Sequence, residues 1–348
     1  METLASPPLR HFSPIPAILR AAGVPPEISV VVPTYRRPWM LDRCLTALLA
    51  QEMSPHRYEI LVCDDGPDAE TKRLVNQRAS EYRAGGWHIV YVPVTRTQGP
   101  AGARNLGWKL ARGDIIGFTD DDTIPDPRWL IEGLRAMQAG PSAVAGHIDV
   151  PLPLHPTDYE LDAAGLGRAE FATANCFVRR SMLERIGGFD ERYTSAWRED
   201  SDLQFSILCA GGTIARAECA VVHHPVRPAR WGVSISQQKK SQFDALLYKK
   251  YPLLYGTRIA PSTPWRYYAI VLSLIVLAVA SALRVAPVAL AAFAVWATLT
   301  LVFTAQRLRT TARRPGHVFE MLMTSIVIPP LSIFWRLYGA WKFRVGFL

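Results

Sequence analysis

The chain has 348 residues, of which 49% are hydrophobic and 20% charged, and its formal net charge is +9. This composition excludes an intrinsically disordered chain, and the length predicts two folding units, or one unit with an appendage. The five cysteines show no CxxC or CxH spacing, so the sequence predicts neither a disulfide framework nor a zinc site and favours a reducing compartment.

The positive charge is concentrated around one apolar stretch. The net charge is −5 over residues 1–226, +6 over 227–258, +2 over 259–305 and +6 over 306–348. The stretch between the two basic segments contains only Arg266 and Arg284 as charged residues from Trp265 to Ala305. Basic flanks around an apolar segment favour a membrane surface, not nucleic acid, as the partner.

A regular alternation of short β-branched runs and helical runs begins after a Pro-rich N-terminal extension, residues 1–27. The predicted strands are Ile28–Val32, Tyr58–Cys63, Trp87–Val92 and Ile115–Thr119, and the predicted helices are Trp39–Gln51, Ala69–Tyr82, Ala101–Leu110 and Pro127–Ala139. Strands that alternate with helices of this length predict an α/β domain, here residues 28–235, with a mostly parallel sheet covered by helices. Such a sheet binds its ligands at the carboxyl ends of the strands.

Three carboxylates in a row, Asp120, Asp121 and Asp122, follow the fourth predicted strand. Adjacent carboxylates repel one another unless a cation compensates, and oxygen ligands suit Mg²⁺ or Mn²⁺. The alternative is an acidic turn that caps the helix beginning at Pro127, with Asp126 as the better cap. These residues alone leave both interpretations open.

Two apolar segments, Tyr267–Leu283 and Val285–Ala305, are each long enough to cross a bilayer as a helix. Neither has a polar face, so we expect a transmembrane hairpin over 265–305, preceded by a basic amphipathic membrane-interface segment, 236–264. Lysines precede the hairpin and arginines follow it, which places both flanks in the cytoplasm by the positive-inside tendency. The sequence thus predicts a multi-pass protein of the cell (inner) membrane whose catalytic domain faces the cytoplasm.

Residues 306–348 form a basic loop and a third membrane-associated segment, with the apolar part at 318–335. Glu320 lies inside this apolar part, and the pair Pro329–Pro330 predicts a break in any continuous helix. Aromatic and basic residues follow the segment, as they do in interfacial segments. Whether the segment crosses the bilayer, re-enters it or lies in the interface stays open.

Six short motifs of this chain occur in the order of those of one enzyme family. They are VVVPTYRR, LVCDDG, GPAGARNLG, FTDDDTIPDPRWL, GGFDERY and WREDSDLQF, and they cover about Ile28 to His224. In these motifs the chain resembles the family 2 glycosyltransferases, whose nucleotide-sugar-binding fold is called GT-A. The resemblance implies a nucleotide-sugar donor and a divalent metal, Mg²⁺ or Mn²⁺, as cofactor.

The resemblance also implies a role for individual residues. Asp120 and Asp122 match the family's DxD motif and are expected to hold the metal, with His223 or its neighbour His224 as a further ligand. The residues expected to bind the donor are Pro33, Thr34, Tyr35, Arg36, Asp65, Arg104 and Asp121. For Arg104 the alternative is a solvated charge on a helix surface, and for Asp65 it is a turn residue before Gly66.

Glu199 and Asp200 resemble the family's ED motif, and the alternative is acidic capping of a helix start. A hydroxyl acceptor must lose its proton as it attacks the anomeric carbon, so a carboxylate within hydrogen-bond reach serves as general base. Asp200 is the expected base, with Glu199 beside it. The processive members' QxxRW motif reads here Arg227-Pro228-Ala229-Arg230-Trp231, which favours transfer of a single sugar over polymer synthesis.

These observations predict a membrane-anchored, inverting, metal-dependent glycosyltransferase that moves one sugar from a nucleotide-sugar donor to a lipid or lipid-linked acceptor. One alternative is transfer to a polyprenyl phosphate, which needs no general base. The other is a non-catalytic membrane scaffold that retains the fold. The sequence leaves the donor, the acceptor and the oligomeric state open.

Overall fold

The computed structural model describes residues 24–96, 99–260 and 263–347, and the chain in it divides into two compact units. Most of the predicted N-terminal extension, residues 1–27, lies outside the described residues. The first unit contains residues up to Pro151 together with Leu166–Pro225, and the second contains Leu152–Gly165 and Val226–Leu348. The short segment Leu152–Gly165 therefore belongs to the second unit, although both of its sequence neighbours belong to the first.

The first unit is built on one eight-stranded sheet in the order β3-β2-β1-β4-β7-β6-β8-β5. The strands are β1 (Ile28–Thr34), β2 (Tyr58–Asp64), β3 (Ile89–Pro93), β4 (Ile115–Thr119), β5 (Ile124–Pro125), β6 (Ala143–Asp149), β7 (Asn175–Arg179) and β8 (Ile214–His223). The four predicted strands correspond to β1–β4, which pair in parallel and confirm the expected parallel core. β7 runs antiparallel to both β4 and β6, so the sheet is mixed beyond β4.

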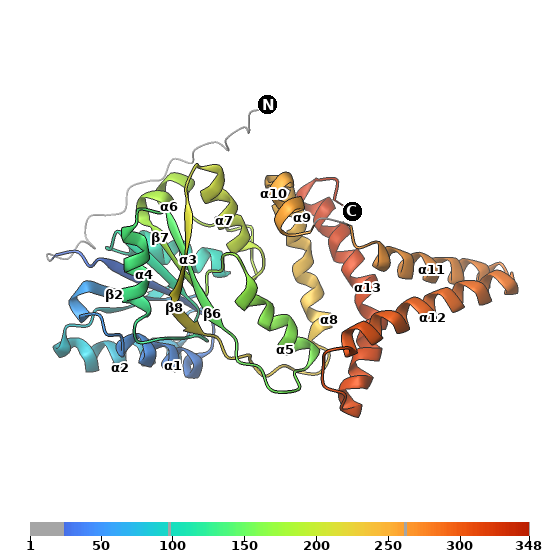
Figure 1. Cartoon of the computed structure of the whole chain (residues 1–348), viewed down its shortest axis with the longest axis horizontal. Helices are drawn as coiled ribbons and strands as arrows, with labels where there is room; N and C mark the ends of the chain where they lie inside the picture. The colour runs from blue at the N-terminus through green and yellow to red at the C-terminus, as the bar shows by residue number, and fades with distance from the viewer. Residues whose placement is uncertain (1–23, 97–98, 261–262, 348) are drawn as a thin grey trace. The chain divides into compact units, whose positions relative to one another are not determined.

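Helices cover both faces of this sheet, as Figure 1 shows. They are α1 (Pro38–Leu49), α2 (Ala69–Tyr82), α3 (Pro100–Leu110), α4 (Trp129–Gln138), α6 (Arg180–Ile186) and α7 (Glu199–Cys209). Three short 3-10 helices accompany them: η2 (Pro55–Arg57), η3 (Arg83–Gly85) and η4 (Ala164–Arg168). The first two residues of η4 belong to the second unit. Two apolar cores result, one on each face. The first packs Leu45 of α1 and Trp129 of α4 against the sheet, and the second packs Ala103 of α3 and Leu203 of α7.

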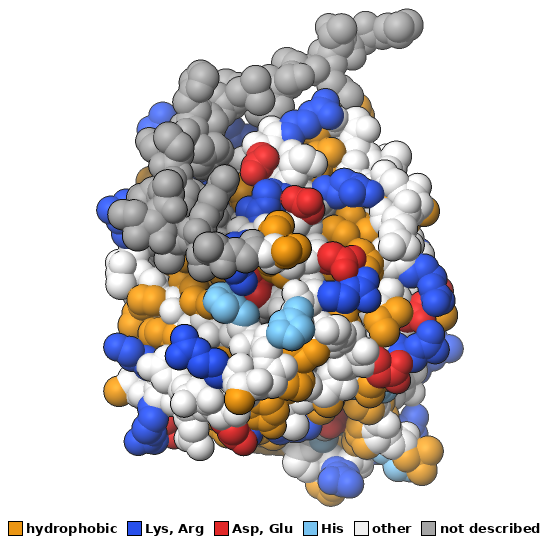
Figure 2. All heavy atoms as spheres, turned by 90° about the vertical axis from the view of Figure 1, so that its left-hand side faces the viewer, with side chains coloured by type: hydrophobic (Ala, Val, Ile, Leu, Met, Phe, Trp, Pro, Cys, Tyr) orange, Lys and Arg blue, Asp and Glu red, His pale blue; other side chains and the backbone are white. Residues whose placement is uncertain are grey.

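The surface of the first unit mixes charges of both signs. On the face shown in Figure 2, Lys and Arg side chains alternate with Asp and Glu side chains, without a broad area of one sign. The near balance of charge counted over residues 1–226 is therefore also a local balance on this face.

Glu59 is a buried carboxylate in β2, on the strand next to β1. It accepts hydrogen bonds from Ser29 Oγ at 2.6 Å, from the Arg112 backbone N–H at 2.6 Å and from Arg112 Nε at 2.8 Å. Burial opposes ionisation, but these donors and His88 outweigh it and lower the pKa of Glu59 to about 2. The carboxylate thus joins two neighbouring strands to the loop that leads into β4.

Replacing Glu59 with Gln is expected to lower the free energy of unfolding by about 2–3 kcal/mol, because Ser29 and Arg112 would lose a buried charged acceptor. Since the folded-state pKa lies below the ordinary value of 4.5, the ionised group stabilises the fold fully above pH ~4.5. That contribution is lost as the pH falls toward about 2. Thermal unfolding of the full chain in detergent between pH 7 and pH 3 measures both effects. Glu70→Gln, at an exposed position of α2, is the matched control, and equal midpoints for the two variants would contradict the expectation.

The second unit is helical. Its helices are α5 (Asp158–Ala163), α8 (Val233–Gln237), η5 (Gln238–Ser241), α9 (Gln242–Lys250), α10 (Pro252–Arg258), α11 (Trp265–Ala282), α12 (Ala286–Leu308) and α13 (Pro315–Phe343). The last three are long and apolar enough to cross a membrane. α11 and α12 correspond to the two predicted segments and form an antiparallel hairpin, with Arg284 in the turn at a left-handed φ of 57°.

The expectation that Pro329–Pro330 breaks the third segment is wrong. Both prolines lie inside α13, which runs for 29 residues. Proline removes the hydrogen bonds to the carbonyls one turn earlier, those of Ser325 and Ile326, but within a packed apolar helix neighbouring helices and hydroxyl side chains compensate for such losses. Ser325 is buried, and its hydroxyl contacts the guanidinium of Arg307 at 3.1 Å.

Candidate active site

Asp121 is the inward-facing member of the three carboxylates that follow β4. It is 3% exposed, and its two oxygens accept hydrogen bonds from Thr34 Oγ1 at 2.8 Å and from Arg37 Nη1 at 3.0 Å. Burial raises the pKa of Asp121 to about 6, while the Arg37 guanidinium acts in the opposite direction. Asp121 therefore ties the loop after β4 to the loop after β1. The sequence analysis expected donor contacts at Thr34 and Asp121 but gave no role to Arg37, the last residue of the VVVPTYRR motif.

Asp120 and Asp122, on either side of Asp121, lie beside His224, the residue that directly follows β8. The ligand atoms of Asp120, Asp122 and His224 lie within 4.8 Å of one another, and His224 Nε2 is 3.5 Å from Asp122 Oδ1. Two carboxylates and one imidazole form a donor set that suits Mn²⁺ and, less well, Mg²⁺. Asp126, the expected helix cap, accepts a hydrogen bond from the Arg128 N–H just before α4, but Arg128 is the N-cap residue and α4 has no side-chain capping bond.

The structure places the neighbouring histidine elsewhere. His223 Nδ1 is 2.8 Å from Asp149 Oδ2, and the two residues are paired in the β6–β8 ladder. His223 is therefore not brought to Asp120 and Asp122, and of the two histidines that the sequence left open, His224 is the one that lies beside these carboxylates. His223 is the last residue of β8 and His224 follows it, and adjacent residues of an extended chain point to opposite sides, which explains why only one of the two reaches the carboxylates.

Arg104, in α3, contacts both Asp120 of the acidic cluster and Glu199 of the ED motif. The side chain is 3% exposed, Nη2 donates to Asp120 Oδ1 at 2.7 Å, and Nη1 donates to Glu199 Oε1 at 3.3 Å. A solvated surface charge, the alternative left open by the sequence, is excluded. The guanidinium forms a positive centre between two acidic groups that come from β4 and α7.

Glu199 and Asp200 begin α7, directly after Arg198, whose φ is 71°. Glu199 is buried, and its Oε2 has no hydrogen-bond partner among the described residues. Asp200 is partly buried, and its Oδ1 accepts from the Ser201 N–H at 2.7 Å. Burial raises the pKa of both carboxyls. A carboxylate with a raised pKa beside a cation has the properties of a general base.

The loop after β1 presents Tyr35 and Arg36 at the carboxyl end of the sheet. Tyr35 is 46% exposed, and the Arg36 guanidinium lies 5.3 Å from its ring centroid. A Cβ atom at Gly66 would lie 2.6 Å from the Tyr35 ring, so glycine is required there for this approach. Pro33 is buried near the end of β1, the strand that leads into this loop.

Asp64 and Asp65, after β2, have different surroundings. Asp64 is fully buried and accepts hydrogen bonds from the Gly66 and Asp68 N–H groups and from the Tyr91 hydroxyl. Both oxygens of Asp65 lie 2.8 Å from the Gly99 N–H. Asp64 therefore closes the turn, and Asp65 holds the residue that precedes α3. Burial raises the pKa of Asp65.

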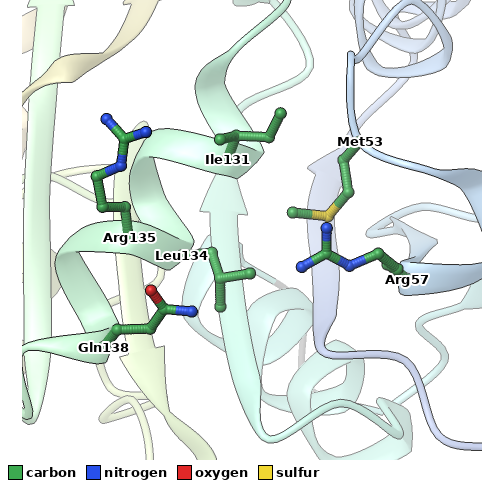
Figure 3. A pocket seen from close by; sticks show the side chains of 6 residues that line it. All are labelled: Met53, Arg57, Ile131, Leu134, Arg135 and Gln138. Atoms are coloured by element: carbon green, nitrogen blue, oxygen red, sulfur yellow. The ribbon is translucent and has the colours of Figure 1, made fainter.

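A separate small pocket, seen in Figure 3, lies at the other end of the sheet. It is lined by Met53, Arg57, Ile131, Leu134, Arg135 and Gln138. Arg57 directly precedes β2 and is paired with Glu27, whereas the acidic cluster follows the carboxyl ends of the strands. The pocket offers neither a carboxylate nor a nucleophile, so the candidate active site is the acidic cluster.

Comparison with known proteins agrees with this fold. Residues 29–186 match the family model described as glycosyl transferase family 2. The chain therefore contains a family 2 glycosyltransferase domain, and its mixed sheet with flanking helices is the GT-A fold.

The curated relatives include named glycosyltransferases and a succinoglycan biosynthesis protein. Glycosyltransferase AglE of Haloferax volcanii is 26% identical over 215 residues, which cover 58% of this chain and 68% of the relative. Succinoglycan biosynthesis protein ExoM of Rhizobium meliloti is 29% identical over 213 residues, covering 58% of this chain and 67% of the relative. Validoxylamine A glucosyltransferase of Streptomyces hygroscopicus subsp. limoneus is 27% identical over 226 residues, and the chain spans about half (49%) of its length.

Among solved structures, a mannosyltransferase from Pyrobaculum calidifontis in complex with GDP-Man and Mn²⁺ has the same fold. The TM-score is 0.57 at 18% identity, and the match covers 92% of this chain and 88% of the other. At this identity the likeness establishes the fold alone.

Proposed function

We propose that this protein is a membrane-anchored inverting glycosyltransferase that moves one sugar from a nucleotide-sugar donor to a hydroxyl group of a lipid or lipid-linked acceptor. The observation that carries the proposal is Arg104, which contacts Asp120 and Glu199 together. Through this arginine the carboxylates suited to a donor's metal stand next to the ED motif, where an acceptor would be activated.

Asp120, Asp122 and His224 would hold a divalent cation, and that cation would supply positive charge to the departing nucleoside diphosphate. The mannosyltransferase with GDP-Man and Mn²⁺ supports this assignment by analogy of fold. Asp121 acts indirectly, since its contacts with Thr34 and Arg37 fix the loops on both sides. We assign Tyr35, Arg36 and Asp65 to the nucleoside end of the donor.

Asp200 takes the proton of the acceptor hydroxyl as its oxygen attacks the anomeric carbon. Glu199 and Arg104 orient this carboxylate, because Arg104 holds Glu199 and its charge acts on Asp200. Attack on the side opposite the leaving group inverts the anomeric centre. A single displacement of this kind needs one base and one stabilised leaving group, and no covalent intermediate.

The second unit supports the proposed acceptor and cellular location. Three apolar helices with basic flanks support membrane association, and the same flanks support a location of the catalytic unit on the cytoplasmic side of the cell membrane. A lipid acceptor is consistent with an anchor that keeps the enzyme at the bilayer. Transfer to a polyprenyl phosphate is the second candidate, and the intact ED motif counts against it.

The test uses the full chain in detergent with a native lipid extract and radiolabelled UDP-, GDP- and dTDP-sugars, in Mn²⁺ or in EDTA. We expect one donor to give label in the organic phase, in Mn²⁺ only. Label that forms equally well in EDTA would refute the metal assignment. If every donor leaves the lipid unlabelled, the lipid acceptor is refuted, and release of nucleoside diphosphate then distinguishes a soluble-acceptor enzyme from an inactive scaffold.

A further inference from the structure

α13 is the helix whose relation to the membrane its composition does not decide. With 29 residues it is about 43 Å long, at roughly 1.5 Å per residue. It is long enough and apolar enough for a third crossing. Its contacts within the second unit, however, distinguish a crossing helix from one that lies flat.

The first contact is with the end of the α11–α12 hairpin. Arg307, in the last turn of α12, is partly buried and donates from Nη1 to Thr324 Oγ1 at 2.7 Å and to Ser325 Oγ at 3.1 Å. The same guanidinium pairs with Asp158 of α5 at 2.7 Å. The basic end of the hairpin, the part expected at the membrane surface, therefore meets the interior of α13, not one of its ends.

The second set of contacts involves the segment that precedes the hairpin, α8, η5 and α9. Near the start of α13, Glu320 Oε1 accepts a hydrogen bond from the Gly232 N–H at 2.7 Å. Near its end, Lys342 Nζ donates to Gln242 Oε1 at 3.1 Å and Lys249 Nζ donates to the Phe343 carbonyl at 2.7 Å. Residues 232–250 thus accompany α13 from one end to the other.

This accompanying segment is too polar to cross a bilayer. Residues 232–250 contain Lys239, Lys240, Asp244, Lys249 and Lys250, and ionised side chains in the hydrocarbon core are strongly disfavoured. If α13 crossed the membrane, it would carry these charges through the core beside it. A flat α13 leaves all of them at the level of the headgroups.

The exposed side of α13 suits that position. Most of its large exposed apolar side chains are spaced three, four or seven residues apart and form one stripe: Phe319, Met323, Val327, Phe334, Leu337 and Trp341. Val318 is also exposed and lies outside this stripe. The opposite side, with Met321, Ile328 and Gly339, is buried. One apolar face along a whole helix, with basic residues at both ends, is typical of helices that lie in the membrane interface.

Figure 1 shows the same arrangement, since α11 and α12 extend together while α13 runs across their base. We propose that α13 does not cross the membrane but lies along its cytoplasmic surface, with the stripe from Phe319 to Trp341 inserted among anionic headgroups and upper acyl chains. The hairpin is then the part of the described chain that crosses, and residues 313 and 344 lie on the same side.

Cysteine labelling from either side of the membrane tests the proposal on the full chain. Cys209 and Cys219, the two exposed cysteines, are first replaced with Ser. Single cysteines are then placed at Arg284, Arg313 and Arg344, and right-side-out and inverted vesicles are treated with a membrane-impermeant maleimide. We expect Arg313→Cys and Arg344→Cys to react from the cytoplasmic side and Arg284→Cys from the other side. Reaction of Arg344→Cys from the same side as Arg284→Cys would show a third crossing, and reaction of all three from one side would show that the hairpin does not cross.

A depth measurement gives an independent result. Spin labels at Phe319→Cys, Val327→Cys and Phe334→Cys, in vesicles that contain anionic lipid, are compared for collision with oxygen and with a water-soluble nickel complex. A flat helix gives the same shallow depth at all three positions, whereas a crossing helix gives its greatest depth at Val327. Labels at Leu272→Cys and Val279→Cys, exposed on α11, are the matched control and should differ in depth. Equal depths on α11 and graded depths on α13 would overturn the proposal.

Discussion

Replacing Asp200 with Asn is expected to lower kcat by about 10²–10⁴-fold, the range that a positioned general base contributes. The amide keeps the shape of the side chain, and its carbonyl oxygen can still accept the Ser201 hydrogen bond, but it cannot take a proton. Donor affinity should change little, because the carboxylates suited to the metal, Asp120 and Asp122, are untouched. Initial rates and donor titration on the same preparation separate the two effects.

The pH dependence provides a second readout for the same residue. Burial raises the pKa of Asp200, so as acidity increases wild-type kcat should begin to fall at a pH above the ordinary range for aspartate. Glu184→Gln, at an exposed position of α6, serves as the control and should keep both rate and profile. If Asp200→Asn retains nearly normal activity, no base is required, and the acceptor is a phosphate such as a polyprenyl phosphate.

Replacing Asp122 with Asn should lower the affinity for Mn²⁺ by at least about 100-fold, since even changes beside a metal ligand typically cost about 10–100-fold. Binding of the nucleotide sugar should then lose its dependence on Mn²⁺. Titration of free Mn²⁺ by electron paramagnetic resonance measures the first effect, and calorimetry with and without EDTA measures the second.

The two adjacent histidines provide a matched pair for this experiment. His224→Ala should weaken Mn²⁺ binding, because its Nε2 lies beside Asp122. His223→Ala should leave Mn²⁺ binding unchanged and lose only the contact with Asp149. The opposite result, with His223 required and His224 dispensable, would show that His223 is the metal ligand.

The parallel half of the sheet could be predicted from the sequence because each of its strands reads as a short apolar run followed by a helix. The other half could not be predicted in this way. β7 lies between β4 and β6 but runs against both, and this direction is set by contacts far apart in the chain, such as Thr119 with Asn175. Local propensity carries no information about strand direction.

The candidate site, too, could be predicted from the sequence only in part. Motifs placed Asp120, Asp122, Glu199 and Asp200 in the site, since each follows a strand or begins a helix at the carboxyl end of the sheet. The choice between His223 and His224 depends on the register of β8 against β5 and β6, in which His223 is paired with Ile124 and Asp149. The role of Arg104 depends on the distance between α3 and α7, which no motif contains.

Because residues 152–165 belong to the second unit, the catalytic unit cannot be obtained by a simple truncation of the chain. The chain passes between its two units three times, after Pro151, after Gly165 and after Pro225. A stop codon after Pro225 would therefore not release a self-contained catalytic unit, because Asp158 of α5 would lose Arg307 and the Pro156 carbonyl would lose the Ala312 N–H. A soluble version for crystallisation also requires an internal deletion, in which a short polar linker replaces residues 152–165.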